Sequence, residues 1–233
     1  MDTSRRTFIT QAGMVVGSGL WAEALMPSAV MARMRAAEEE EVSATEDLMR
    51  EHGLLNRVLL IYDDVVHRMN AKKEFPPDAL KNAASIIKEF IEEYHEKLEE
   101  DHLFSRFEKA KQMTELVDTL HTQHDAGRDL TGFIIKHANA SDLKDAKTAK
   151  DVAGSIASFN RMYRPHESRE DTILFPAFKK LVSKHEYDAL GEEFEKEEKK
   201  KFGSDGFESV LHRVETIERT LGLYDLSQFT PKL

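Results

Sequence analysis

The chain has 233 residues, of which 33% are charged and 8% are aromatic, with 11 glycines and 6 prolines. This composition favours long solvated helices over strands and predicts an all-α protein. The formal net charge of −10 and the absence of a basic stripe argue against a nucleic-acid partner. Because the chain contains no cysteine, disulfides, thiolate zinc sites and iron–sulfur clusters are excluded, and histidine and carboxylate remain as metal ligands.

The first segment resembles an export signal. A pair of arginines, Arg5 and Arg6, precedes a long, weakly apolar run rich in small residues, as in the twin-arginine signals that a bacterial export machinery reads. We therefore expect residues 1–32 to be a signal peptide, residues 33–44 to be a spacer, and the protein to be periplasmic. A membrane anchor formed by the uncleaved segment is the alternative, which Glu23 and the glycines of the run disfavour.

Apolar residues that recur every three or four positions predict four long helices within a domain of residues 45–182. The expected helices lie at about 43–70, 78–110, 114–138 and 146–181, with Pro165 interrupting or kinking the last. Short polar connections between long amphipathic helices predict an up-down-up-down four-helix bundle. Residues 183–233 are expected to form a C-terminal helical extension, whose last apolar stripe either packs along the bundle or joins a second copy in a homo-oligomer.

A short pattern occurs twice, on the expected second and fourth helices. In each copy a histidine is followed four residues later by a glutamate, then by an acid and a Leu-Phe pair. The first copy supplies His95 and Glu99, and the second supplies His166 and Glu170. Positions i and i+4 lie on one face of a helix, so each copy directs an imidazole and a carboxylate to the same place. One such pair is common on helix surfaces, whereas two in register predict a site between helices.

His52 and His124 lie within the apolar stripes of the first and third expected helices. A carboxylate inside a bundle costs free energy unless it is paired or bound to a cation. Two bridging glutamates with imidazoles from four helices would hold two ions, and this mixed ligand set suits iron, with manganese and zinc as alternatives. The predicted metal ligands are His52, His95, Glu99, His124, His166 and Glu170.

These residues resemble the hemerythrin-like family, also called the HHE cation-binding domain, over about residues 46–182. The family pattern is a His on helix one, His-x-x-x-Glu on helix two, His on helix three, and His-x-x-x-Glu followed by Leu-Phe-Pro on helix four. The six predicted ligands meet this pattern, as does Leu174-Phe175-Pro176. The resemblance implies a non-haem di-iron centre that meets dioxygen or a related small oxidant, and that in some members senses iron or oxygen.

One departure from the oxygen-carrying members of the family affects the chemistry. Those members have a histidine pair four residues apart on helix three and an aspartate on helix four, whereas here His121 and His124 are three apart and helix four offers Glu170. The resemblance therefore implies a more carboxylate-rich centre, nearer to oxidation or iron handling. Three hypotheses follow: a di-iron protein that binds or senses dioxygen, a di-iron oxidase, peroxidase or iron-handling enzyme, and a helical interaction protein with a structural metal.

Side chains near the predicted ligands have alternative interpretations. His121 is either an additional ligand or a surface group, whereas His102 is expected at the core or a cavity edge because its counterpart in the second copy is Ile173. We expect Arg128 on the surface and tyrosines near the site as core residues. Four acids flank the ligands and are expected to be solvated, with Glu100 the candidate to orient a ligand histidine: Glu96, Glu100, Glu167 and Asp171.

Overall fold

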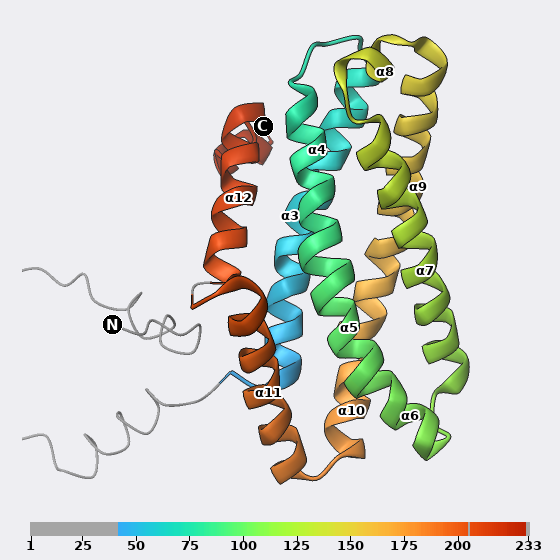
Figure 1. The fold of residues 1–233 in the computed structure, drawn as a ribbon, viewed down its shortest axis with the longest axis vertical. Helices are drawn as coiled ribbons and strands as arrows, with labels where there is room; N and C mark the ends of the chain where they lie inside the picture. The colour runs from blue at the N-terminus through green and yellow to red at the C-terminus, as the bar shows by residue number, and fades with distance from the viewer. Residues whose placement is uncertain (1–41, 205, 232–233) are drawn as a thin grey trace, which may run out of the picture.

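The computed structural model describes residues 42–204 and 206–231. The predicted signal peptide, residues 1–32, lies outside the described residues. Across the described residues the chain is helical without a strand, which confirms the all-α prediction. Four long helices run side by side, and two more pack along one flank of this bundle (Figure 1). None of the described helices combines the length and the apolar character needed to cross a membrane.

The first and third long helices are regular. The first, α3, spans Ala44–Asn70 and begins at the predicted capping box, in which Glu46 accepts a hydrogen bond of 3.0 Å from the backbone N–H of Ser43. The third, α7, spans Thr114–His137. A short helix, α8, at Ala140–Lys144 then leads into the fourth.

The second and fourth long helices each contain π-helical segments. The second long helix, residues 77–110, comprises α4 (Pro77–Ile86), η1 (Ile87–His95), α5 (Glu96–Leu98), η2 (Glu99–Phe104) and α6 (Ser105–Ala110), of which η1 and η2 are π-helical. The fourth long helix, residues 146–181, comprises α9 (Ala146–Arg169), the π-helical η3 (Glu170–Leu174) and α10 (Phe175–Leu181). A π segment therefore begins at each repeated glutamate, and such segments are frequent at functional sites.

The sequence predicted an interruption or a kink at Pro165, and the structure shows no interruption of the fourth long helix there. Helix α9 continues through it to Arg169, and the departure from α geometry begins only at Glu170. Proline removes a single backbone donor, and Pro165 is exposed, so the helix can continue around it.

The C-terminal residues cover one flank of the bundle. Helix α11 spans Lys184–Phe202 and contacts α3, whereas α12 spans Gly206–Leu221 and contacts α3 and α4 (Figure 1). A 3-10 turn, η4, follows at Leu226–Phe229. Of the two alternatives for the last apolar stripe, packing along the bundle is therefore correct, and its buried apolar residues are Phe207, Val210, Val214, Ile217 and Leu221.

The apolar part of the repeated pattern forms the packing around the site. Leu103 and its counterpart Leu174 are fully buried. The rings of Phe107 and Phe178, which are also counterparts, contact each other with their centroids 6.0 Å apart. The duplicated sequence therefore produces duplicated packing between the second and fourth long helices.

Candidate metal centre

The structure brings the six predicted ligand residues together inside the bundle. The second and fourth long helices each contribute a histidine and a glutamate, and α3 and α7 each contribute one histidine. Each of the six residues is 4% exposed or less: His52, His95, Glu99, His124, His166 and Glu170.

The four histidines form two pairs. Nε2 of His52 lies 3.0 Å from Nε2 of His95, and we call this pair the first half-site. Nε2 of His124 lies 3.2 Å from Nε2 of His166, and we call this pair the second half-site. The first half-site joins α3 to the second long helix, and the second joins α7 to the fourth.

Each glutamate faces both half-sites. Oε2 of Glu99 lies 3.6 Å from Nε2 of His95 and 3.5 Å from Nε2 of His124. Glu170 divides its oxygens, with Oε2 3.4 Å from Nε2 of His52 and Oε1 3.2 Å from Nε2 of His166. Atoms that bind one ion at about 2.0–2.2 Å lie roughly 3–4 Å from each other. The spacing therefore suits two ions bridged by two carboxylates.

The carboxylates of the two glutamates are not satisfied by hydrogen bonds. Glu99 and Glu170 are 0% exposed, and within the described part of the chain none of their four carboxylate oxygens has a hydrogen-bond partner of acceptable geometry. Leaving such groups without compensation costs several kcal/mol at least. Cations between the carboxylates and the four Nε2 atoms would remove this cost, so the residues present fit a metal centre.

The outer nitrogen of every histidine in the centre has an acceptor. In the first half-site, Nδ1 of His52 is 2.7 Å from Oδ1 of Asp171, and Nδ1 of His95 is 2.7 Å from Oε2 of Glu51. Donation from Nδ1 fixes the tautomer and leaves Nε2 to bind an ion.

The second half-site repeats this arrangement with one change. Nδ1 of His124 is 3.2 Å from Oε1 of Glu100, whereas Nδ1 of His166 is 2.9 Å from Oε1 of Gln123, which is an amide. Glu100 and Asp171 each follow a repeated glutamate, and they contact His124 and His52, the single histidines of α7 and α3. Glu51 and Gln123 each precede one of these single histidines, and they contact His95 and His166 of the repeated pattern.

Sequence reasoning identified only part of this support. It singled out Glu100 as a residue that could orient a ligand, and the structure confirms that contact. It placed Asp171 in solvent, which is wrong because this half-buried side chain binds His52. It did not identify Glu51 or Gln123, although each directly precedes a predicted ligand and this repeated position was a signal.

The Phe of each Leu-Phe pair stacks on a ligand histidine. The ring of Phe175 lies 5.6 Å from that of His52 at an interplanar angle of 13°. The ring of Phe104 lies 5.5 Å from that of His124 at 18°. Each lone histidine is therefore held on its face by an aromatic ring and at Nδ1 by a carboxylate.

Burial and neighbouring charges set the protonation of the centre. Burial lowers the pKa of His95, and it lowers that of His124 to about 4. Burial also acts to lower the pKa of His52, but Asp171 and Glu170 raise it to about 10. Without metal, His52 is therefore protonated at neutral pH.

The two glutamates shift in opposite directions. Burial and the neighbouring charge of Glu170 raise the pKa of Glu99 well above its ordinary value. Burial acts to raise the pKa of Glu170 too, but His166 and His52 hold it well below its ordinary value. The raised pKa of Glu99 favours its protonated form in the metal-free protein, and bound cations would favour the ionised form instead.

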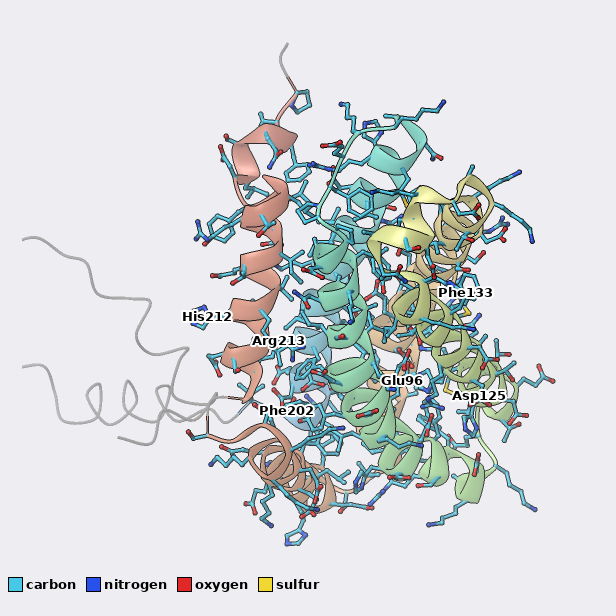
Figure 2. The ribbon with its side chains drawn as sticks, turned by 45° about the horizontal axis from the view of Figure 1, so that its top comes forward. Glu96, Asp125, Phe133, Phe202, His212 and Arg213 are labelled. Atoms are coloured by element: carbon cyan, nitrogen blue, oxygen red, sulfur yellow. The ribbon has the colours of Figure 1, made fainter. Side chains whose placement is uncertain are left out.

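Three residues predicted to lie in solvent or on the surface are instead part of a buried polar layer beside the centre. Glu96 is 1% exposed and accepts a hydrogen bond of 2.6 Å from the hydroxyl of Tyr163. Arg128 is half-buried and pairs with Glu96 at 2.8 Å. Glu167 is 3% exposed and accepts a hydrogen bond of 3.0 Å from Asn56. In Figure 2, Glu96 lies between the second long helix and α7.

Two further histidines lie outside the centre. The side chain of His121 is 52% exposed, and its Nε2 is 4.0 Å from Oε1 of Glu100. His102 is half-buried against Phe194 of α11, with the ring centroids 5.4 Å apart. Its position at the edge of the core agrees with the sequence interpretation.

The comparison with protein families agrees with this geometry. The profile described as Hemerythrin HHE cation binding domain matches residues 43–178 and, a second time, residues 116–217. The chain belongs to the hemerythrin HHE cation-binding family. The second match begins in α7, as the first begins at α3, which agrees with the duplicated contacts of this HHE protein.

Relatives of this HHE protein carry no functional description. It is 45% identical over 194 residues to an uncharacterized protein of Mycobacterium bovis, and equally to two uncharacterized proteins of Mycobacterium tuberculosis strains. The matched region covers 83% of this chain and 76% of each relative. No solved structure matches the chain.

Proposed function

We propose that this chain is an exported non-haem di-iron protein that binds or senses dioxygen or a related small oxidant. The observation that carries the proposal is the pair of fully buried carboxylates, Glu99 and Glu170, whose oxygens lack hydrogen-bond partners within the described chain and face imidazoles of both half-sites. Such an arrangement is costly without cations and favourable with them.

The ligand set favours iron over the other metals considered. Each half-site offers two imidazole nitrogens and carboxylate oxygens from both glutamates. Iron and manganese accept such mixed sets with further positions open for a small molecule, whereas structural zinc prefers a closed tetrahedral site. Iron bound here would supply the redox chemistry needed to interact with dioxygen.

Residues of the chain orient the histidines that would hold the iron and exclude bulk water from them. The Nδ1 contacts fix the four imidazoles, and the rings of Phe104 and Phe175 cover two of them. Because the ligands are buried among apolar residues, a small uncharged molecule can approach more easily than bulk water.

A second candidate is an enzyme that turns over peroxide or oxidises ferrous iron. The observation that favours it is Tyr163, whose ring centroid lies 5.3 Å from that of His166 and whose hydroxyl donates to the buried Glu96. A phenol with a carboxylate acceptor beside a ligand can hold or move a proton. A proton-transferring pair of this kind is consistent with the more carboxylate-rich centre, nearer to oxidation or iron handling, that the family resemblance implies.

Metal analysis and visible spectroscopy separate these functions. The full-length chain is purified, its bound metals are measured, and an anaerobic reduced sample is exposed to air. Two irons per chain with a reversible oxygen-dependent band would support binding or sensing. Irreversible bleaching with consumption of peroxide would support the enzyme. A colourless protein that retains zinc would contradict both and favour a structural metal.

Export is tested separately by fractionation of bacterial cells. Replacing both Arg5 and Arg6 with lysine should leave the protein in the cytoplasm, because twin-arginine signals require the pair. Unchanged periplasmic recovery of this variant would contradict export by that machinery, and recovery with the membrane would favour the anchor.

A further inference from the structure

One face of α7 connects the second half-site to the surface. His121, His124 and Arg128 are spaced by three and four residues, so they lie on the same side of this helix. All three contact Glu100 of the second long helix. Glu100 thus links an exposed histidine, a buried ligand histidine and an arginine.

The contacts of Glu100 have the spacing of a cation site. Its Oε1 lies 4.0 Å from Nε2 of the exposed His121 and 3.2 Å from Nδ1 of His124. Ligand atoms of Glu96, Glu100 and His124 all lie within 4.8 Å of one another. Oxygen and nitrogen donors at these separations can share a divalent ion after small side-chain rotations.

Arg128 occupies the space between these carboxylates. Its Nη2 contacts both Glu96 and Glu100. Tyr163 donates a hydrogen bond to Glu96 from the other side. Residue 127 must be glycine for this contact, because a Cβ there would lie only 2.2 Å from the Tyr163 hydroxyl. A fixed guanidinium is therefore held where buried carboxylates would otherwise attract a mobile cation.

A surface pocket of about 400 Å³ reaches this layer from outside. Arg128 and Glu92 line it, and Lys88 and Lys97 lie at it, with Lys97 also pairing with Glu100. Glu92 is only 5% exposed, and within the described residues its Oε1 has no partner of acceptable geometry, although Thr131 hydrogen-bonds its carboxyl group. This incompletely satisfied buried carboxylate in the pocket wall is a second, independent sign that a cation can be taken up here.

The equivalent position beside the first half-site is different. Asn56 stands four residues after His52, as Arg128 stands four after His124, and it donates a neutral amide hydrogen to Glu167. Within the described ranges, the carboxylates on that side do not form a comparable three-ligand group with His52. Asn56 therefore provides a matched control for Arg128.

We propose that the seam between α7 and the second long helix is the entrance for the ions, formed by His121, Glu100 and Glu96, with Arg128 as the counter-cation that an incoming ion displaces. The inference rests on the proposed metal centre. On this route His121 and Glu100 would hold an incoming ferrous ion first, and Arg128 would turn toward the pocket, so that Glu96 and Glu100 could pass the ion to the second half-site. Arg128 prevents the carboxylates from remaining uncompensated between loading events.

Loading kinetics test this entrance. Cobalt(II) is the probe, because it has the charge of ferrous iron, is stable in air and develops visible bands when it is bound. Metal-free full-length protein is mixed with cobalt(II), and the rate and final amount of uptake are measured for the wild type, His121→Ala and Arg128→Gln. The controls are Asn56→Ala and the exposed His185→Ala.

Because His121 is the first ligand on this route, His121→Ala should load more slowly than the wild type. Arg128→Gln should load faster, since no guanidinium has to be displaced. Both variants should reach the same final cobalt content as the wild type, and both controls should load at the wild-type rate. Equal final content also shows that the variants are folded.

Two results overturn the inference in distinguishable ways. If the wild type takes up two cobalt ions but His121→Ala and Arg128→Gln load at its rate, the entrance is wrong and the proposed centre stands. An Asn56→Ala variant that loads faster, together with an Arg128→Gln variant that loads at the wild-type rate, would move the entrance to the other side. If the wild type takes up no cobalt, both the entrance and the proposed function fail.

Discussion

The two half-sites of the centre have the same ligands but unequal support. Each consists of a lone histidine and a repeated histidine, and each faces both glutamates. In the first half-site, two carboxylates lie 2.7 Å from the Nδ1 atoms. In the second, a carboxylate lies at 3.2 Å and an amide at 2.9 Å.

The two half-sites therefore share their ligand types but differ in the acceptors that surround them. A carboxylate acceptor makes an imidazole more basic than an amide acceptor does, so the first half-site should bind its ion more tightly. Unequal affinities would let the two ions load in order. The following predictions test this comparison, beginning with the largest expected effect.

Glu99 and Glu170 are the two residues that both half-sites share. Replacing Glu99 or Glu170 with glutamine should remove most of both ions, because each side chain faces a histidine in each half-site. Metal content per purified chain is the measurement, and Glu115→Gln, at an exposed position, is the control. Full retention of metal in both variants would refute the bridging role.

The Nδ1 acceptors should separate the half-sites. Glu51→Gln should weaken the first half-site, and Gln123→Glu should strengthen the second, each by about 10–100-fold, the range typical of such outer contacts. Titration of the metal-free protein with cobalt(II) should show two binding steps in the wild type, and these steps should move closer together in both variants. Identical titration curves for the wild type and Gln123→Glu would mean that the amide is not the cause of any difference.

The metal-free protein should respond differently to the loss of the two carboxylates. Glu99→Gln should destabilise the metal-free protein less than Glu170→Gln does, because the raised pKa of Glu99 favours the protonated form that glutamine resembles. Glu170→Gln should lower the free energy of unfolding by about 1–3 kcal/mol, since it removes an ionised partner of His52. Denaturant unfolding of both chelated variants gives the comparison.

The pH dependence gives the sign of the His52 contribution. Because its pKa in the folded chain is about 10, above the ordinary 6.5, this histidine stabilises the metal-free fold fully below pH 6.5. The contribution is lost as the pH rises through 10. The destabilisation caused by Glu170→Gln should therefore shrink between pH 7 and pH 10, and an effect that stays constant over this interval would contradict the assignment.

The stacked phenylalanines should have the smallest effects. Phe175→Leu and Phe104→Leu keep most of the apolar volume, so each should cost less than about 1.5 kcal/mol of stability. Because Phe175 covers His52 and Phe104 covers His124, each change should loosen metal binding mainly in its own half-site. Parallel thermal melts and cobalt(II) titrations distinguish the two effects, and a similar loss in both half-sites would argue against independent support.

The sequence identified the six predicted ligands as one group because their pattern repeats. Two copies of His-x-x-x-Glu in register, with a histidine on each other helix, identified six residues that the structure brings together. Their supporting partners come from other helices, and no local pattern reports which helices are neighbours. Glu51 and Gln123 were missed for this reason, although their shared position before a ligand was visible.

The sequence was a poorer guide to the positions of charged residues that the fold buries. Arg128, Glu96 and Glu167 were assigned to solvent or the surface from their residue type, yet they satisfy one another or nearby polar groups inside the bundle. The helix bounds were predicted closely, since caps and polar turns are local signals. The π segments at Glu99 and Glu170 were not, because residue periodicity does not distinguish them from α-helix.

Iron content combined with electron paramagnetic resonance of the air-oxidised full-length chain tests the central claim most directly. If Glu99 and Glu170 bridge two ferric ions, the chain should hold both irons, and their magnetic coupling should suppress the signal of isolated high-spin ferric iron. Glu170→Gln should lose this coupled pair. A wild-type chain that binds a single iron with the isolated ferric signal, or that binds zinc alone, would contradict the account.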